Sequence, residues 1–182
     1  MAQTKANQDP LALKLMRTAF KFLTPLLPGT MSRYAYNLWL TPPRMSPPER
    51  ELRYIESAKQ STINVEGENI KLWHWGEGPT VLFIHGWGGR GTQISCFVDD
   101  LVKAGFQVVG VDLPAHGQSD GKQTNALIMA KALKAVINQI DNLHSIITHS
   151  FGAVILGLDY DANLSTKNIV MICPPATMNT AF

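Results

Sequence analysis

The chain has 182 residues, 45% of them hydrophobic and 16% charged, which excludes a disordered chain and allows one domain with its own core. Its formal net charge of +2 is too small to predict a nucleic-acid partner. The basic excess lies in residues 1–60, which hold nine Lys and Arg against four Asp and Glu, whereas residues 61–182 hold seven against ten.

Residues 10–27 are predicted to form an amphipathic helix that ends at Pro25 and the Pro28-Gly29 pair. Basic residues share one of its faces and apolar residues line the other: Lys14, Arg17 and Lys21 against Leu15, Met16, Ala19, Leu23 and Leu26. A basic amphipathic helix can bind a membrane surface. The same apolar face can instead pack on the protein's own core, and this is the interpretation that we favour.

An apolar patch, YAYNLWL at 34–40, precedes a proline-rich segment, TPPRMSPPER at 41–50. Four prolines in ten residues are typical of a linker or of an extended, polyproline-like connection. The sequence therefore predicts an N-terminal helical extension with a linker over residues 1–60 and a main domain over residues 61–182.

Beyond residue 60, short apolar runs alternate with helical patterns. STINV and IKLWHW flank Gly67 and predict a β-hairpin. Further strands are predicted over 80–86, 106–112, 144–150 and 168–173, with helices over 92–104, 124–140 and 151–160. This alternation is typical of an α/β fold, with a mostly parallel sheet that helices cover on both faces.

Three unusual loops follow the carboxyl ends of these strands: HGWGGRG (85–91), DLPAHGQSDG (112–121) and HSFGA (149–153). In open α/β sheets, ligands bind at this edge. The second loop can be an ordinary turn or part of a site, and Asp112 could accept hydrogen bonds from local N–H groups and so fix it. The first loop has two further readings, an ordinary flexible turn and a phosphate-binding loop, but neither G-x-G-x-x-G nor a G-K-[ST] ending is present.

Ser150 lies where the strand signals stop and the helix signals start. A hydroxyl needs a base and a fixed geometry to act as a nucleophile, and a sharp strand-to-helix turn supplies part of that geometry. The alternative is a helix N-cap. Gly152 suits such a turn, whereas the β-branched Thr148 crowds it. The N–H groups of Phe151 and Trp87 are the expected hydrogen-bond donors to an oxyanion.

The five histidines show neither H-x-x-x-H nor H-E-x-x-H spacing, so no metal site and no cofactor are predicted. His116 could serve as a base, but nothing in the sequence places it near Ser150. His85 and His149 flank the loops and are expected to be structural.

Together, the three motifs resemble the α/β-hydrolase superfamily, in order and spacing, from about residue 61 to residue 175. HGWGG is similar to its oxyanion loop, DLPAHGQSDG to its D-x-P-G-H-G-x-S segment with Ala115 in place of glycine, and THSFGA to its nucleophile elbow G-x-S-x-G. The resemblance implies Ser150 as nucleophile, with the N–H groups of Phe151 and Trp87 as oxyanion donors. It implies a serine hydrolase that cleaves a small-molecule ester, or a related acyl bond, through an acyl-enzyme. Serine at this position argues against the dehalogenase relatives that use an aspartate nucleophile.

In this superfamily an Asp or Glu and then a His follow the nucleophile. Here no Asp, Glu or His follows Asp161, and Asp159 and Asp161 are expected at the wrong edge of the sheet. We therefore expect an incomplete α/β-hydrolase, truncated at its C-terminus and inactive by itself. The alternatives are an acyltransferase and a non-catalytic relative that uses its sheet as an interaction surface and self-associates through an unpaired edge.

The sequence favours a cytoplasmic protein. Two distant cysteines, Cys96 and Cys173, suggest buried free thiols in a reducing compartment. No run reaches the roughly 18 apolar residues that a transmembrane helix needs. The basic residues of 10–27 interrupt the stretch where a signal peptide would have its apolar region.

Overall fold

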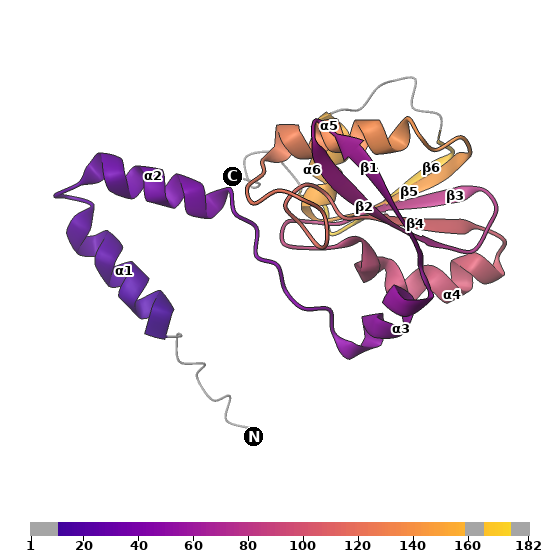
Figure 1. The fold of residues 1–182 in the computed structure, drawn as a ribbon, viewed down its shortest axis with the longest axis horizontal. Helices are drawn as coiled ribbons and strands as arrows, with labels where there is room; N and C mark the ends of the chain where they lie inside the picture. Colours follow the sequence, from indigo (N-terminus) through magenta and orange to yellow (C-terminus); the bar gives the residue numbers. More distant parts are fainter. Residues whose placement is uncertain (1–10, 159–165, 176–182) are drawn as a thin grey trace. The chain divides into compact units, whose positions relative to one another are not determined.

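The computed structural model describes residues 11–158 and 166–175. The chain divides into two units, Met1–Leu40 and Thr41–Phe182, and each is considered by itself (Figure 1). Asp159, Asp161 and the C-terminal residues 176–182, on which part of the sequence interpretation rests, lie outside the described residues.

The first unit contains two helices, α1 (Leu11–Leu23) and α2 (Pro28–Trp39), rather than the single helix expected over 10–27. The Pro28-Gly29 pair was expected to end a helix, but Pro28 instead begins α2. Proline is well tolerated at the first helical position, because the N–H that it lacks has no partner there. The same residue type can therefore end one helix and begin another, which the sequence pattern did not separate.

Side chains of the first unit are largely exposed. No residue of α1 is buried, and Met31 is the buried residue of α2. A ring contact between Phe20 and Tyr34, with centroids 5.9 Å apart, connects the two helices. The expected packing of this segment on the main domain stays a prediction. None of the helices in the described part of the chain is long and apolar enough to cross a membrane.

A six-stranded mixed sheet forms the centre of the second unit, in the order β1-β2-β4-β3-β5-β6. Strands β4, β3, β5 and β6 are parallel to one another, whereas β1 and β2 pair in antiparallel fashion and β2 is antiparallel to β4. The strands are β1 (Lys59–Val65), β2 (Glu68–Trp75), β3 (Thr80–Ile84), β4 (Gln107–Val111), β5 (Leu143–His149) and β6 (Asn168–Ile172). The expected strands and the hairpin are therefore confirmed, with ends that shift by a few residues.

The β1–β2 hairpin turns through Glu66 and Gly67, which have φ angles of 53° and 91°. Positive φ at both central residues defines the turn type that matches the twist of the two strands. Glycine adopts this conformation without a steric penalty, which is why a single glycine between two alternating runs predicted the hairpin.

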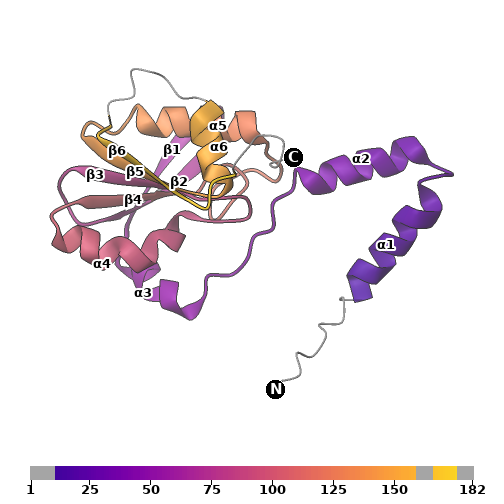
Figure 2. The same ribbon diagram turned by 180° about the vertical axis from the view of Figure 1, so that it is seen from behind.

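Helices cover both faces of the sheet, as expected for this fold class (Figures 1 and 2). On one face lie α5 (Ala126–Ile137) and α6 (Phe151–Leu158), and on the other lie α3 (Glu49–Ser57) and α4 (Ser95–Lys103). Each face has its own apolar core. Strand β3 serves both, because Leu82 belongs to the core under α5 and α6 while the next residue, Phe83, belongs to the core under α3 and α4.

Residues 41–58 are part of the second unit. The sequence analysis assigned these residues to a linker and predicted the domain boundary near residue 60. In the structure, the chain divides between Leu40 and Thr41. This segment includes α3, whose Tyr54 is buried in the core beside α4. Proline-rich composition predicted the extended conformation over 42–48 but not the contacts that fix it to the domain.

Both cysteines are free thiols, but they are exposed, which corrects the expectation that they are buried. Cys96 lies on the outer side of α4, whose buried residues are Ser95 and Val98. Helical periodicity therefore turns Cys96 away from the sheet, although its neighbour in sequence points inward.

Candidate active site

The three glycine-rich loops leave the sheet at one edge. Ile84, the last residue of β3, is paired with Val111 at the end of β4 and with Thr148 near the end of β5. Because these strands are parallel and in register, the residues that follow them emerge side by side. The loops after β3 and β4 and the turn between β5 and α6 therefore surround one region, which we call the loop edge.

Ser150 joins β5 to α6 in a strained conformation. Its φ angle is +50°, a left-handed value that costs an L-residue about 1–2 kcal/mol. Its N–H donates to the Ile172 carbonyl at the end of β6, over 2.9 Å, and its carbonyl accepts from the Ala153 N–H in α6. These two bonds fix the corner, and such strain is commonly retained where a side chain must be presented for chemistry.

Two glycines allow the backbone to close around Ser150. A Cβ at Gly86 would lie 3.0 Å from the Ser150 Cβ and 3.1 Å from the His149 carbonyl oxygen. A Cβ at Gly152 would lie 2.5 Å from the carbonyl oxygen of Ile84, closer than such atoms approach in real proteins. The first turn of α6 therefore packs directly on the end of β3, and only glycine fits there.

Thr148 occupies the position where the family motif has glycine. Its side chain is fully buried, and its Oγ1 has no hydrogen-bond partner among the described residues. The left-handed conformation at Ser150 forms nonetheless. The β-branched side chain is therefore accommodated beside the turn rather than preventing it.

Trp87 and Phe151, the two residues expected to supply oxyanion donors, lie against each other. Their rings meet edge to face, with centroids 5.9 Å apart. Phe151 follows Ser150, and Trp87 follows Gly86, which contacts Ser150. Within the described residues, nothing accepts a hydrogen bond from the backbone N–H of either. The structure thus brings together the serine and both expected N–H donors.

His85 is a structural residue. It is fully buried, its Nδ1 donates to the Gly86 carbonyl over 2.7 Å, and its Nε2 accepts from the Leu113 N–H over 3.0 Å. Burial lowers its pKa to about 4, so the ring is neutral at pH 7. With both nitrogens engaged, His85 ties the loop after β3 to the loop after β4.

His116 lies within the same cluster of rings. It contacts His85 and Trp87, with centroids 4.9 and 5.4 Å apart. Its Nδ1 donates to the Pro114 carbonyl over 3.0 Å, while its buried Nε2 has no partner in the described part of the chain. Burial, followed by the neighbouring His85, lowers its pKa to about 4. The Trp87 ring therefore contacts both His116 and Phe151.

Asp112 fixes both loops by accepting hydrogen bonds, as the sequence suggested. Its buried carboxylate accepts from the N–H groups of Gly91 (2.6 Å) and Gln118 (2.8 Å) and from the Trp73 indole (3.1 Å). Burial raises its pKa, and these three bonds act against that rise. Gly117 is necessary beside it, because a Cβ there would lie 2.2 Å from the carboxyl carbon.

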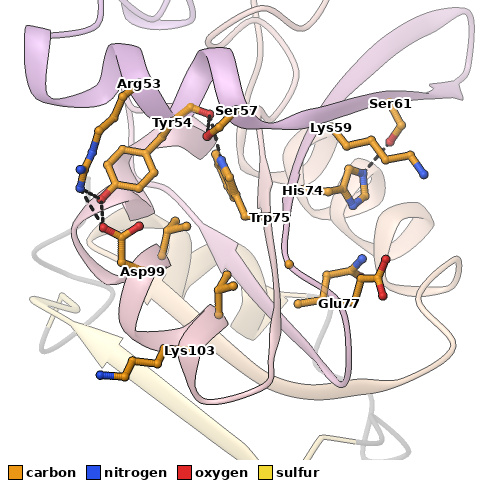
Figure 3. A pocket seen from close by; sticks show the side chains of 14 residues that line it. Arg53, Tyr54, Ser57, Lys59, Ser61, His74, Trp75, Glu77, Asp99 and Lys103 are labelled. Carbon is orange, nitrogen blue, oxygen red and sulfur yellow. Dashed lines mark hydrogen bonds and ion pairs between the residues drawn. The ribbon is translucent and has the colours of Figure 1, made fainter.

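A groove of about 1130 Å³ lies at the opposite edge of the sheet, between α3, α4 and the outer strands (Figure 3). Its polar side chains bind one another: Arg53 and Tyr54 both donate to Asp99, and Ser61 bonds to His74. We assign no chemistry to this groove, because it is remote from the loop edge and several of its polar groups bind one another.

The family described as alpha/beta hydrolase fold matches residues 79–180. Since this match covers more than half of the chain, the chain belongs to that family. A curated relative, a 2-hydroxy-6-oxononadienedioate/2-hydroxy-6-oxononatrienedioate hydrolase of Escherichia coli, is 35% identical over 98 residues, which are 47% of this chain and 34% of the relative. The chain thus spans about a third of the length of this relative.

Solved structures give the same fold. A thioesterase domain from the curacin biosynthetic pathway has a TM-score of 0.53 and 27% identity, over 57% of this chain and 39% of that one. An epoxide hydrolase from Vigna radiata (TM-score 0.57, 21% identity) matches over 64% of this chain and 38% of the epoxide hydrolase chain. A haloalkane dehalogenase from Agrobacterium tumefaciens (TM-score 0.57, 20% identity) matches over 64% of this chain and 41% of the dehalogenase chain. The latter two are similar in fold alone.

Sequence reasoning located the loops but missed the residues that support them from upstream. Arg44 and Glu51 both contact the loop edge, although they lie in or beside the proline-rich segment. No motif marks them. The only signal is that charged side chains occur among prolines, which is equally typical of a solvated linker.

Two glycines of α6 provide a matched test of the close packing beside Ser150. Gly152→Ala is expected to lower the free energy of unfolding by more than about 2 kcal/mol, because α6 must move away from β3. Gly157, on the same helix, has no atom near its missing Cβ. Gly157→Ala is expected to stabilise by about 0.5–1 kcal/mol through helix propensity. Urea unfolding of both variants measures this, and equal effects would contradict the assigned packing.

The buried histidines predict that acid destabilises the protein. His85 and His116 have pKa values of about 4 in the folded state, against an ordinary 6.5. The unfolded state therefore binds protons that the folded state does not, and stability falls as the pH drops from 6.5 towards 4, by about 1.4 kcal/mol per pH unit for each histidine.

The slope of the unfolding free energy against pH, between pH 6.5 and 5, should therefore be smaller in His116→Gln than in wild type. The difference should be the contribution of about one bound proton. The raised pKa of Asp112 contributes with the opposite sign, so only the difference between variant and wild type is diagnostic. An unchanged slope in His116→Gln would show that this ring is not held neutral.

Proposed function

We propose that the chain carries the nucleophile and the oxyanion donors of a serine hydrolase that cleaves a small-molecule carboxylic ester, or a related acyl bond, through an acyl-enzyme. The observation that carries the proposal is the left-handed conformation of Ser150, with φ of +50°, at the corner between β5 and α6. A helix N-cap needs no such strain, since capping residues have extended backbones.

In the proposed reaction, the Ser150 Oγ attacks the carbonyl carbon of the substrate and the carbonyl oxygen becomes an oxyanion. The N–H groups of Phe151 and Trp87 donate to that oxygen, and the N-terminus of α6 adds favourable electrostatics. The tetrahedral intermediate then expels the leaving group and forms an ester with Ser150, which water hydrolyses. Removing one such donor typically costs about 2.7–4 kcal/mol of transition-state stabilisation.

The proton of Ser150 must pass to a base, and neither of the two histidines in the ring cluster beside Trp87 is well suited to accept it. Both nitrogens of His85 are engaged, and His116 is buried against Trp87 with a strongly lowered pKa. The family order places the acid and the histidine later in the sequence. The proposal therefore includes an acid and a base beyond residue 182, which agrees with a chain that spans 34% of its curated relative.

The substrate class rests on the chemistry of the site and on the relatives. A thioesterase and a hydrolase of 2-hydroxy-6-oxononadienedioate are the two named relatives above 25% identity. Attack on a carbonyl carbon suits an ester or thioester substrate equally. Transfer of the acyl group to an acceptor other than water would make the protein an acyltransferase, with the same roles for Ser150, Phe151 and Trp87.

A non-catalytic role is the second candidate. Strand β6 lies at the edge of the sheet, and Val170 and Met171 on it are half exposed, at 51% and 50%. An exposed strand edge with apolar side chains promotes association with another chain.

A cytoplasmic location also remains part of the proposal, because Cys96 and Cys173 are free thiols.

The nucleophile can be tested in the full-length protein with a fluorophosphonate probe, which reacts covalently with activated serines. Wild type should be labelled, and Ser150→Ala should lose the label, because no other hydroxyl lies at the strained corner. Ser61→Ala, on β1, is the matched control and should label normally. Undiminished labelling of Ser150→Ala would refute the assignment.

The isolated 182-residue chain should have little esterase activity, because no suitable base is in place. Without it, a well-formed site retains only about 10³–10⁴-fold catalysis over water. Turnover of short p-nitrophenyl esters should therefore be nearly the same for the wild-type chain and for Ser150→Ala. Robust turnover that disappears in Ser150→Ala would instead show that His116, or another histidine within these 182 residues, serves as the base.

A further inference from the structure

Residues 43–51, which we call the N-terminal brace, contact both loops of the loop edge. They belong to the second unit and precede its first strand, in a segment whose composition predicted a linker. The contacts are of three kinds: a guanidinium on carbonyl groups, a buried ion pair and a proline against a glycine. Each reaches a residue near Trp87.

Arg44 binds the loop after β4. Its guanidinium donates to three carbonyl oxygens, those of Gly117 (2.7 Å), Ser119 (2.8 Å) and Gly121 (2.8 Å). The planar fork of two terminal nitrogens reaches the three acceptors in a fixed geometry, whereas an ammonium group directs its three donors from a single nitrogen. Arg44 therefore holds this loop in one shape, and with it the ring of His116 that contacts Trp87.

Glu51 binds the loop after β3. Its carboxylate is buried, with 1% of the residue exposed, and it accepts from the Arg90 Nε (2.6 Å) and Nη2 (2.8 Å) and from the Thr92 hydroxyl (2.7 Å). The two parallel bonds to Arg90 form the bidentate geometry that fixes both position and orientation. Arg90 lies three residues after Trp87, within the same loop.

Pro43 completes the brace. A Cβ on Gly88 would lie 3.1 Å from the Pro43 Cγ, so the proline ring lies directly against the residue after Trp87. Gly88 has a φ angle of +69°, a conformation that glycine adopts without strain and that turns the loop sharply. The brace thus meets the loop after β3 at two places, Gly88 and Arg90.

We infer that the N-terminal brace sets the position of the Trp87 N–H, and that Arg44 and Glu51 are positioning residues for the oxyanion site. The inference rests on the proposed function, in which Trp87 supplies one of the two oxyanion donors. Three contacts converge on Trp87: Arg44 through His116, Glu51 through Arg90, and Pro43 through Gly88. Oxyanion stabilisation depends on donors that are already in place, so even a small displacement of this N–H slows the reaction.

Arg44 offers the cleaner test of the two residues. Glu51 is buried, and its removal would leave Arg90 and Thr92 without their acceptor, which can unfold the domain. Arg44 is exposed, and water can replace it at the three carbonyls. Arg53 is the matched control, because it is an exposed arginine that pairs with Asp99 at the opposite edge of the sheet.

The experiment follows the labelling of the full-length protein by the fluorophosphonate probe over time. Arg44→Met should reach the same final extent of labelling as wild type, with a rate constant about tenfold lower. Arg44→Lys should be slowed as well, because a single ammonium nitrogen does not reproduce the fork of two nitrogens that binds these carbonyls. Arg53→Met should react like wild type. A purely structural role would lower the melting temperature and the final extent, not the rate constant of the folded fraction.

Hydrogen exchange of the amides of 86–90, in the same variants, reports on the loop itself. Faster exchange in Arg44→Met than in Arg53→Met supports the inference, as does a fall in kcat for an ester substrate at unchanged KM. Unchanged labelling rate and exchange in Arg44→Met would overturn it while leaving Ser150 as the nucleophile. A wild-type protein that the probe does not label would overturn the proposed function and this inference together.

Discussion

The buried carboxylate of Asp112 is the interaction on which the arrangement at the loop edge depends. It accepts from the Gly91 N–H in the loop after β3, from the Gln118 N–H in its own loop and from the Trp73 indole on β2. A carboxylate without partners would be costly in this position, whereas three donors from three parts of the chain stabilise it and fix those parts relative to one another. Gly117 is required beside it, because no side chain fits there.

A second constraint is the close approach of α6 to β3. Without a side chain at Gly152, the first turn of α6 packs on the Ile84 carbonyl, and Gly86 leaves room for the Ser150 Cβ. The parallel register of β3 and β5 places these groups at one edge before any loop is considered. The strain at Ser150 is therefore maintained by the sheet on one side and the helix on the other.

The supports of Trp87 come from parts of the chain that lie far apart in sequence. His85 joins the two loops through its two nitrogens, His116 packs on the Trp87 ring, and the N-terminal brace holds both loops from outside. Both histidines are neutral because burial lowers their pKa values, so the cluster adds no charge next to the proposed oxyanion. In the proposed function, this neutrality leaves stabilisation of the oxyanion to the backbone N–H groups and to the helix terminus.

Sequence by itself determined the α/β class, the order of strands and helices from residue 59 onward, the hairpin and the three loops at one edge, because period, glycine placement and strand alternation are local signals. It also singled out Ser150, Phe151, Trp87 and Asp112. The tertiary structure alone decided that Pro28 begins a helix, that both cysteines are exposed, and that residues 41–58 belong to the domain. It likewise decided two sets of contacts between distant residues. Glu51 pairs with Arg90, which lies 39 positions later, and the hydrogen bonds of Arg44 reach as far as Gly121, which lies 77 positions later. Such contacts leave no periodic trace, since they depend on where the folded chain brings distant groups together.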